Sequence, residues 1–189
     1  MNVLLHICCA PCALFPVNQI RKSGNQVTGF FYNPNIHPFA EYSARREALE
    51  RYSASSGLEV IFGDYDIENY FRNVIYDEGS PQDRCPACWW LRLQKTAAVA
   101  LQNGFGSITT TLLGSPYQEH ETIKNALAKI CEETSLHCYY EDFRVGFRDA
   151  HALAHQEGIY CQKYCGCLFS EREWHVRTSQ RSKAKSALR

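Results

Sequence analysis

The chain has 189 residues, including 20 basic and 20 acidic side chains, and its formal net charge is zero. This length is enough for one domain with a sizeable buried core, so the fold does not depend on covalent cross-links. The balanced charge excludes a strong electrostatic field over the whole molecule. Any nucleic-acid binding must therefore come from local basic patches.

Residues 3–7 form a short apolar run that predicts a buried strand, and Pro11 stands at a first-turn position of the helix expected to follow, at 13–22. In chain order the pattern then predicts a strand at 27–32, a helix at 39–56, a strand at 58–62, helices at 67–75 and 89–103, a strand at 107–113, a helix at 119–133 and a strand at 137–140.

This alternation of strand and helix with short connections predicts an α/β fold with a doubly wound, mostly parallel, Rossmann-like sheet. The turns that follow the strands then collect along one edge of the sheet, where such folds bind ligands. We expect residues 1–175 to form a single domain that ends in a cysteine-rich segment, and residues 176–189 to form a basic tail. Within 141–189 we expect irregular structure that folds back over the sheet edge.

Ten cysteines are present, and eight of them fall into three clusters. The clusters are Cys8, Cys9 and Cys12; Cys85 and Cys88; and Cys161, Cys165 and Cys167. The apolar run at 3–7 is too short for a signal peptide or a membrane span, so we expect a cytoplasmic protein with reduced thiols and no membrane partner. In that setting clustered cysteines indicate metal binding or redox chemistry. Cys131 and Cys138 stand apart, and we interpret both as inert buried thiols.

The first cluster lies at the turn between the first strand and its helix. Amides at the start of a helix favour negative charge, which promotes the thiolate that binds metal. Cys85 and Cys88 have the spacing of a metal-binding pair, although a CxxC sequence is also compatible with a redox dithiol. Together with Cys8 and Cys9 they make four thiolates, which suit either zinc or a four-iron cluster.

Cys165 and Cys167 are separated only by Gly166, so a disulfide between them would close a small, strained ring. Strained disulfides are the labile, electron-carrying kind, which favours a redox pair. The alternative is a further pair of metal ligands.

Four segments together carry a resemblance to a known family: Cys8-Cys9-Ala10-Pro11-Cys12, Arg84-Cys85-Pro86-Ala87-Cys88-Trp89 with Arg92-Leu93, Thr110-Thr111-Leu112-Leu113 before Ser115-Pro116-Tyr117-Gln118-Glu119-His120-Glu121, and Tyr160-Cys161-Gln162-Lys163-Tyr164-Cys165-Gly166-Cys167 with Ser170. In these segments the chain, from about residue 3 to 170, resembles the cobalamin-independent epoxyqueuosine reductases, the QueH family. The resemblance implies a Rossmann-like domain of the nucleotide α-hydrolase type that reduces epoxyqueuosine to queuosine at the wobble base of tRNA, the last step of queuosine biosynthesis.

The resemblance also implies a [4Fe–4S] cluster, which carries over to Cys8, Cys9, Cys85 and Cys88, and a redox-active pair, Cys165 and Cys167. An additional mononuclear iron in some members makes Cys12 and Cys161 further candidate ligands. Cys12, which stands where some relatives carry Asp, is a candidate catalytic residue as well. The proton donor stays open among Tyr164, His120 and Asp142, each of which is equally compatible with a structural hydrogen-bonding role.

The implied partners are tRNA carrying epoxyqueuosine and an unidentified electron donor. The basic tail can neutralise phosphates, although a solvated disordered tail is the alternative. Five aromatic residues are candidates for stacking on a flipped wobble base: Tyr32, Tyr65, Trp89, Trp90 and Tyr117. A core role is the alternative for these rings.

Two other functions are compatible with clustered cysteines. One is an iron–sulfur-dependent tRNA-thiolating enzyme of similar fold, although such enzymes need a glycine-rich pyrophosphate loop where this chain has cysteines. The other is a non-enzymatic binding module stabilised by zinc, but a chain with so large a core does not need zinc in order to fold.

Overall fold

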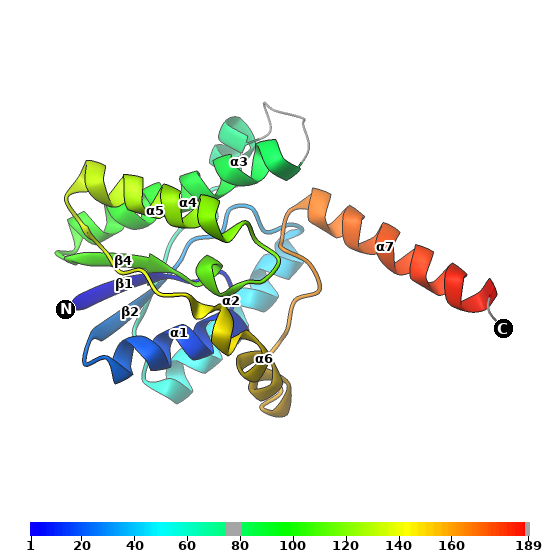
Figure 1. Cartoon of the computed structure of the whole chain (residues 1–189), viewed down its shortest axis with the longest axis horizontal. Coiled ribbons are helices and arrows are strands. Elements are labelled where there is room, and N and C mark those ends of the chain that lie inside the picture. Colours follow the sequence, from blue (N-terminus) through cyan, green and yellow to red (C-terminus); the bar gives the residue numbers. More distant parts are fainter. Residues whose placement is uncertain (75–80, 188–189) are drawn as a thin grey trace.

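In the computed structural model, which describes residues 1–74 and 81–187, a sheet of five strands lies between two layers of helices (Figure 1). The strands are β1 (Asn2–His6), β2 (Gln26–Phe31), β3 (Val60–Phe62), β4 (Ser107–Thr110) and β5 (His137–Cys138). All four pairings are parallel, and the order is β3-β2-β1-β4-β5. This confirms the predicted Rossmann-like architecture.

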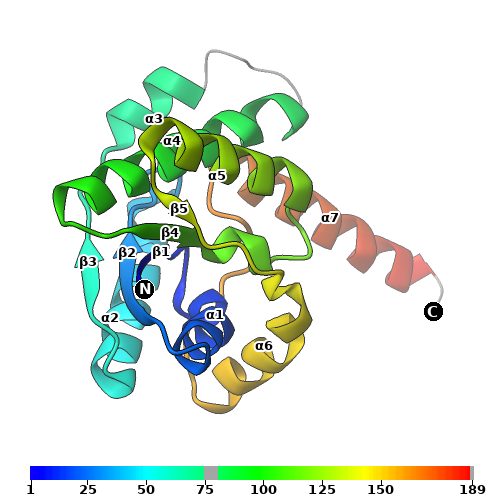
Figure 2. The same ribbon diagram turned by 60° about the vertical axis from the view of Figure 1, so that its left-hand side comes forward.

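The helices are α1 (Ala10–Lys22), α2 (Phe39–Ser56), α3 (Ile67–Val74), α4 (Pro81–Gln102), α5 (His120–Thr134), α6 (Phe147–Gln156) and α7 (Leu168–Ala187), with 3₁₀ turns η1 (Thr111–Gly114) and η2 (Phe143–Gly146). Helices α3, α4 and α5 cover one face of the sheet, and α1, α2 and α6 cover the other (Figures 1 and 2). Among the described helices, none combines the length and the apolar character needed to cross a membrane.

Strand β1 is the central strand, and its sequence explains why. Val3, Leu4 and Leu5 are apolar on both faces and have no exposed surface. A continuous apolar run of this kind suits a parallel strand covered by helices on both sides. Strand β1 therefore pairs with β2 on one side and β4 on the other, and the turn that leaves it opens at the middle of the sheet edge.

Several predicted boundaries are wrong, among them the start of the strand expected over 58–62, which begins at Val60. The strand expected over 107–113 ends at Thr110, because the Thr110 side chain accepts the Leu112 N–H and starts η1. Helix α4 begins at Pro81 rather than at Trp89, so Cys85 and Cys88 lie inside the helix. The strand expected over 137–140 is reduced to His137–Cys138. Ile75, the last residue of the expected helix at 67–75, lies outside the described residues.

The expectation of irregular structure over 141–189 is confirmed for residues 141–142 and for residues 159–167, the second of which carries three cysteines. The residues on either side of them form α6 and α7. Gly146 and Gly158, which we interpreted as signs of irregular structure, flank α6 instead. Residues 176–187 of the expected tail continue α7, which extends away from the rest of the molecule in both views (Figures 1 and 2). Arg189 lies outside the described residues.

Gly146 marks the closest packing between α1 and α6. A Cβ atom at this position would overlap the ring of Phe15, which is on α1. Only glycine therefore lets α6 pack against α1 and direct the chain toward the cysteine-bearing segment.

We expect Gly146→Ala to lower the free energy of unfolding by about 1–3 kcal/mol, because overpacking forces side chains or backbone to shift. Gly106→Ala is the matched control, since its Cβ would meet no heavy atom within 4 Å. Its expected effect is within about 1 kcal/mol. Urea unfolding of both variants gives the comparison, and equal stability of the two would contradict the packing described here.

Candidate metal and redox site

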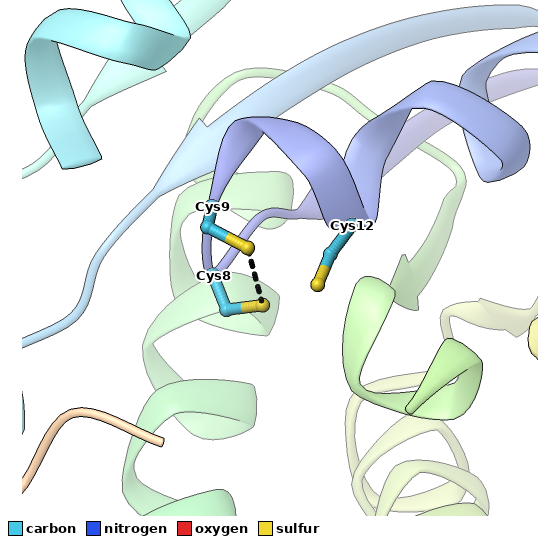
Figure 3. A group of neighbouring side chains, drawn as sticks. All are labelled: Cys8, Cys9 and Cys12. Atoms are coloured by element: carbon cyan, nitrogen blue, oxygen red, sulfur yellow. Dashed lines mark hydrogen bonds between the residues drawn. The ribbon is translucent and has the colours of Figure 1, made fainter. Parts of the chain in front are cut away.

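The turn after β1 brings three sulfur atoms together. Cys9 is the N-cap residue of α1, Cys8 precedes it, and Cys12 lies in the first turn of the helix. The three sulfurs lie within 4.8 Å of one another, and they are turned toward the same space (Figure 3). Within the described part of the chain this is the one group of three or more His, Cys, Asp or Glu side chains with metal-binding geometry. The predicted cluster at Cys8, Cys9 and Cys12 can therefore hold a metal ion.

Polar side chains from two other segments contact these sulfurs. Thr111 of η1 donates its hydroxyl to the Cys8 sulfur at 3.3 Å and accepts the Cys8 N–H at 3.1 Å. Gln162 donates its Nε2 to the Cys9 sulfur at 3.0 Å and lies 3.9 Å from the Cys12 sulfur. The end of β4 and the C-terminal segment thus both reach the turn after β1.

The three cysteines of this group differ in the direction in which their pKa values shift. Hydrogen bonds from Cys12 and Cys9 lower the pKa of Cys8, and Thr111 lowers it further. Burial raises the pKa of Cys9, whereas the hydrogen bonds to Cys8 and Cys9 raise the pKa of Cys12. In the metal-free protein the group therefore favours one thiolate, at Cys8, stabilised by its neighbours.

The second pair, Cys85 and Cys88, lies on α4. The two residues are half-buried and buried, respectively, and both are free thiols. Burial raises the pKa of Cys85 to about 11 and that of Cys88 to about 12. Cys167 packs against the small apolar cluster that contains Cys88, so the second and third clusters lie next to each other, and negative charge on Cys165 and Cys167 raises both pKa values further. Because metal ligands must be deprotonated, binding at these thiols would release protons.

The third cluster is held over the sheet edge by backbone contacts. The guanidinium of Arg45 donates to the carbonyls of Tyr164 at 3.0 Å and Cys165 at 2.8 Å, and the His37 N–H donates to the Gly166 carbonyl at 2.8 Å. The Tyr164 hydroxyl donates to the His37 carbonyl at 2.7 Å. The segment that bears the cysteines is therefore fixed against α2 and the loop before it.

Gly166 allows the third cluster its close approach to the body. Its φ of +145° lies in a region that L side chains rarely adopt, and an added Cβ would lie 3.0 Å from Ile36 and 3.1 Å from Asn35. Both the backbone conformation and the space therefore require glycine between Cys165 and Cys167.

The two cysteines of this pair have different surroundings. Cys165 is exposed, and its sulfur accepts the amide Nε2 of Gln118 at 3.4 Å. Gln118 is oriented by Trp89, whose indole N–H donates to its Oε1 at 3.0 Å. Cys167 directly precedes α7, and its sulfur accepts the Ser170 N–H at 3.4 Å. The pair therefore presents one accessible thiol and one thiol held at a helix start.

The remaining candidates are placed as follows. Cys161 is half-buried and contacts the Ile159 carbonyl, outside the group formed by Cys8, Cys9 and Cys12. The three proton-donor candidates all have structural hydrogen bonds: Tyr164 to His37, His120 to Tyr140 and Asp142 to Arg144. The last of these contacts lowers the pKa of Asp142 to about 2.

Two buried arginines near the sulfurs received no role from the sequence. Arg45 and Arg92 are each 1 % exposed. Arg92 follows Cys88 by four residues and Cys85 by seven, so all three lie on one face of α4. That spacing is the signal that could have identified Arg92, whereas the partners of Arg45 are carbonyls some 120 residues away.

The chain matches the family model "Epoxyqueuosine reductase QueH" over residues 3–173. It is 36 % identical over 173 residues to the Epoxyqueuosine reductase QueH of Dehalococcoides mccartyi, covering 91 % of this chain and 93 % of that protein. It is similarly 36 % identical over 190 residues to the protein of the same description from Thermotoga maritima, with 95 % and 97 % covered. The Haemophilus influenzae relative is 33 % identical, over 95 % of this chain and 76 % of its own length.

A family model that spans nearly the whole chain, together with relatives aligned end to end, agrees with the resemblance carried by the cysteine motifs. This chain belongs to the epoxyqueuosine reductase QueH family.

Proposed function

We propose that this protein is an epoxyqueuosine reductase that converts epoxyqueuosine at the tRNA wobble position to queuosine and water in the cytoplasm. Membership of the QueH family supports the reaction. The observation that carries it in the structure is the convergence of three cysteine clusters, from the turn after β1, from α4 and from residues 161–167, on one edge of the sheet. A zinc-stabilised module has no need of so many thiols beside an uninterrupted apolar core.

The residues at this edge fit an iron–sulfur group. The donors are soft thiols, they are partly or fully buried, and side-chain N–H and O–H groups point at their sulfurs. We assign a [4Fe–4S] cluster to Cys8, Cys9, Cys85 and Cys88, and an additional mononuclear iron to Cys12 and Cys161. When bound, such a cluster supplies electrons one at a time.

The Cys165 and Cys167 thiols can together supply two electrons, whereas an iron–sulfur cluster supplies them one at a time. Their oxidation to a disulfide releases two electrons and two protons. Reduction of the epoxide consumes both: two C–O bonds break, a C=C bond forms, and the oxygen leaves as water. The pair and the reaction therefore balance, and an electron donor of unidentified nature must reduce the disulfide again. Cys12, beside Cys8 and Cys9, is the third cysteine that we place at the reacting edge.

For the tRNA backbone we propose the distal half of α7. Beyond Glu173 the sequence contains no acidic residue, whereas Arg177, Arg181 and Lys183 are exposed on the helix. Because α7 starts directly after Cys167 and extends away from the body, it can contact phosphates while the anticodon lies at the cysteines (Figure 1).

For the base itself we propose Tyr117. Of the five aromatic candidates it is the most exposed, at 85 %, whereas Tyr32 and Trp89 are buried in the core. The neighbouring residue, Gln118, donates to the Cys165 sulfur, so a base stacked on Tyr117 would lie beside the redox pair.

The cysteine assignment predicts different losses for two variants of anaerobically purified protein. Cys8→Ala should lose both iron and sulfide and the conversion of epoxyqueuosine-containing tRNA, measured by nucleoside mass spectrometry. Cys167→Ala should keep the iron and sulfide but convert the tRNA much more slowly, and Cys131→Ala, on α5, is the control. Loss of the cluster in Cys167→Ala would reassign this pair to metal binding. Zinc without conversion, or ATP-dependent sulfur incorporation, would refute the reductase.

The α7 assignment predicts weaker, less salt-dependent tRNA binding for the double variant Arg177→Gln/Arg181→Gln. Each lost phosphate contact should reduce the slope of log affinity against log salt by about 1. Lys22→Gln/Arg51→Gln is the matched control, because the C-terminal halves of α1 and α2 lie at the opposite edge of the sheet. An unchanged slope in the α7 variant would place tRNA elsewhere.

The stacking assignment predicts that Tyr117→Ala lowers kcat/KM, since stacking of one base contributes about 1–3 kcal/mol. Tyr117→Phe keeps the ring and should retain near-normal activity. Iron content should not change in either variant. Equal activity of the alanine and phenylalanine variants would remove Tyr117 from the base site.

A further inference from the structure

Arg92 is a fully buried cation without a carboxylate partner. Its side chain donates from Nε to the Cys88 carbonyl at 3.3 Å and from Nη1 to Asn33 Oδ1 at 3.3 Å. The remaining nitrogen, Nη2, is buried and has no hydrogen-bond partner. Among the ion pairs of the described residues, none includes Arg92. A buried guanidinium in this condition is strongly unfavourable unless an anion lies nearby.

Arg45 shows how the same protein satisfies another buried arginine. Its Nε pairs with Glu41 at 2.7 Å, and its two terminal nitrogens donate to the carbonyls of Cys165 and Tyr164. All three nitrogens of the Arg45 guanidinium therefore have hydrogen-bond partners, and Glu41 balances its charge. Arg92 differs from Arg45 in both respects.

The groups around Arg92 that can carry negative charge are mainly sulfurs. Burial by itself lowers the pKa of Arg92, but the sulfurs of Cys88, Cys165 and Cys8, once ionised, lie close enough to outweigh burial and raise the pKa, with a smaller effect from Tyr70. These cysteines belong to three different clusters. Arg92 is therefore the cation common to all three.

We infer that Arg92 is a positioning residue for the iron–sulfur group: its charge balances the thiolate-bound cluster, and its free Nη2–H is the donor available to a cluster sulfur. The inference rests on the proposed function, because that group is assigned there. Net charge and hydrogen bonds to sulfur set the reduction potential of such clusters. A nearby cation and an N–H donor stabilise the reduced, more negative state, so Arg92 raises the potential.

The test compares Arg92→Met, which removes the charge, with the wild-type protein, both purified anaerobically. We expect the variant to have a lower cluster reduction potential in an EPR-monitored titration. Because outer-shell partners contribute about 10- to 100-fold in metal affinity, the chelator concentration that removes half of the iron should fall by a similar factor. An unchanged potential and unchanged chelator sensitivity would overturn the inference.

Thermal unfolding of the metal-free proteins separates this role from a structural one. Removing an unmatched buried charge should leave the melting temperature of the metal-free Arg92→Met protein equal to or above that of the wild type. If Arg92 serves only to hold Asn33 and the Cys88 carbonyl, the variant should instead melt lower in both forms. Arg45→Met is the control, and it should melt lower without metal because Glu41 loses its partner.

Two further outcomes are decisive. If Arg92→Met does not fold, Arg92→Gln replaces it: the amide keeps an N–H donor but removes the charge, so we expect a lowered potential, and a wild-type potential would overturn the inference. If the wild type binds a metal other than an iron–sulfur cluster, the proposed function fails. Arg92 is then judged by whether Arg92→Met releases that metal more readily, which supports the inference, or holds it equally well, which refutes it.

Discussion

The hydrogen bonds of Arg45 to the backbone of the cysteine-bearing segment hold the whole site together. The side chain comes from the buried face of α2, and it clamps two carbonyls that lie about 120 residues further along the chain. Glu41 matches its charge, and the Tyr160 hydroxyl donates to the same carboxylate. Residues 159–167 form neither a strand nor a helix, so this clamp, together with the hydrogen bonds between His37 and the residues Tyr164 and Gly166, holds the third cluster at the sheet edge.

The fold explains why sulfur chemistry is concentrated at this edge. In a parallel sheet the turns after the central strands meet at one place, which many α/β proteins fill with a phosphate-binding loop. Here Cys8, Cys9 and Cys12 occupy the turn after β1, and Thr111 at the end of β4 donates to a thiol rather than to a nucleotide. The start of a helix favours anions, whether phosphate or thiolate. Here the hydrogen bonds from Cys12, Cys9 and Thr111 lower the pKa of Cys8.

Much of this could be predicted from the sequence, for physical reasons that also explain the failures. Strand β1 has a continuous apolar pattern because both of its faces are buried. Helix α1 has a periodic apolar pattern because one full stripe of it is buried. Helix α7 has no such stripe, since residues 175–184 are all exposed, and so periodicity could not reveal it. The sequence predicts a helix only from Trp89 onward, whereas α4 begins at Pro81 and accommodates Pro86 within it.

The cysteine clusters could be identified from the sequence as candidate metal or redox sites, and the structure confirms that the sulfurs of Cys8, Cys9 and Cys12 lie close together. The contacts that hold them could not be predicted. Gln162 reaches Cys9 across 153 residues, and Arg45 binds backbone carbonyls, which every residue offers and no sequence pattern marks. Gln118 contacts Cys165 only because Trp89, next to Cys88, turns its amide in that direction. Such contacts depend on the tertiary fold rather than on spacing.

The balance of charge at the site links metal binding to the stability of the fold. Arg45 and Arg92 are each 1 % exposed there, and the described ion pairs supply one carboxylate, Glu41, between these two. Burial holds Cys85 and Cys88 in their neutral form, with pKa values raised to about 11 and 12, so in the metal-free protein these thiols supply little negative charge to Arg92. Binding of a metal would convert them to thiolates and provide the missing anion. Metal binding at the proposed ligands would therefore also balance the charge of the buried Arg92.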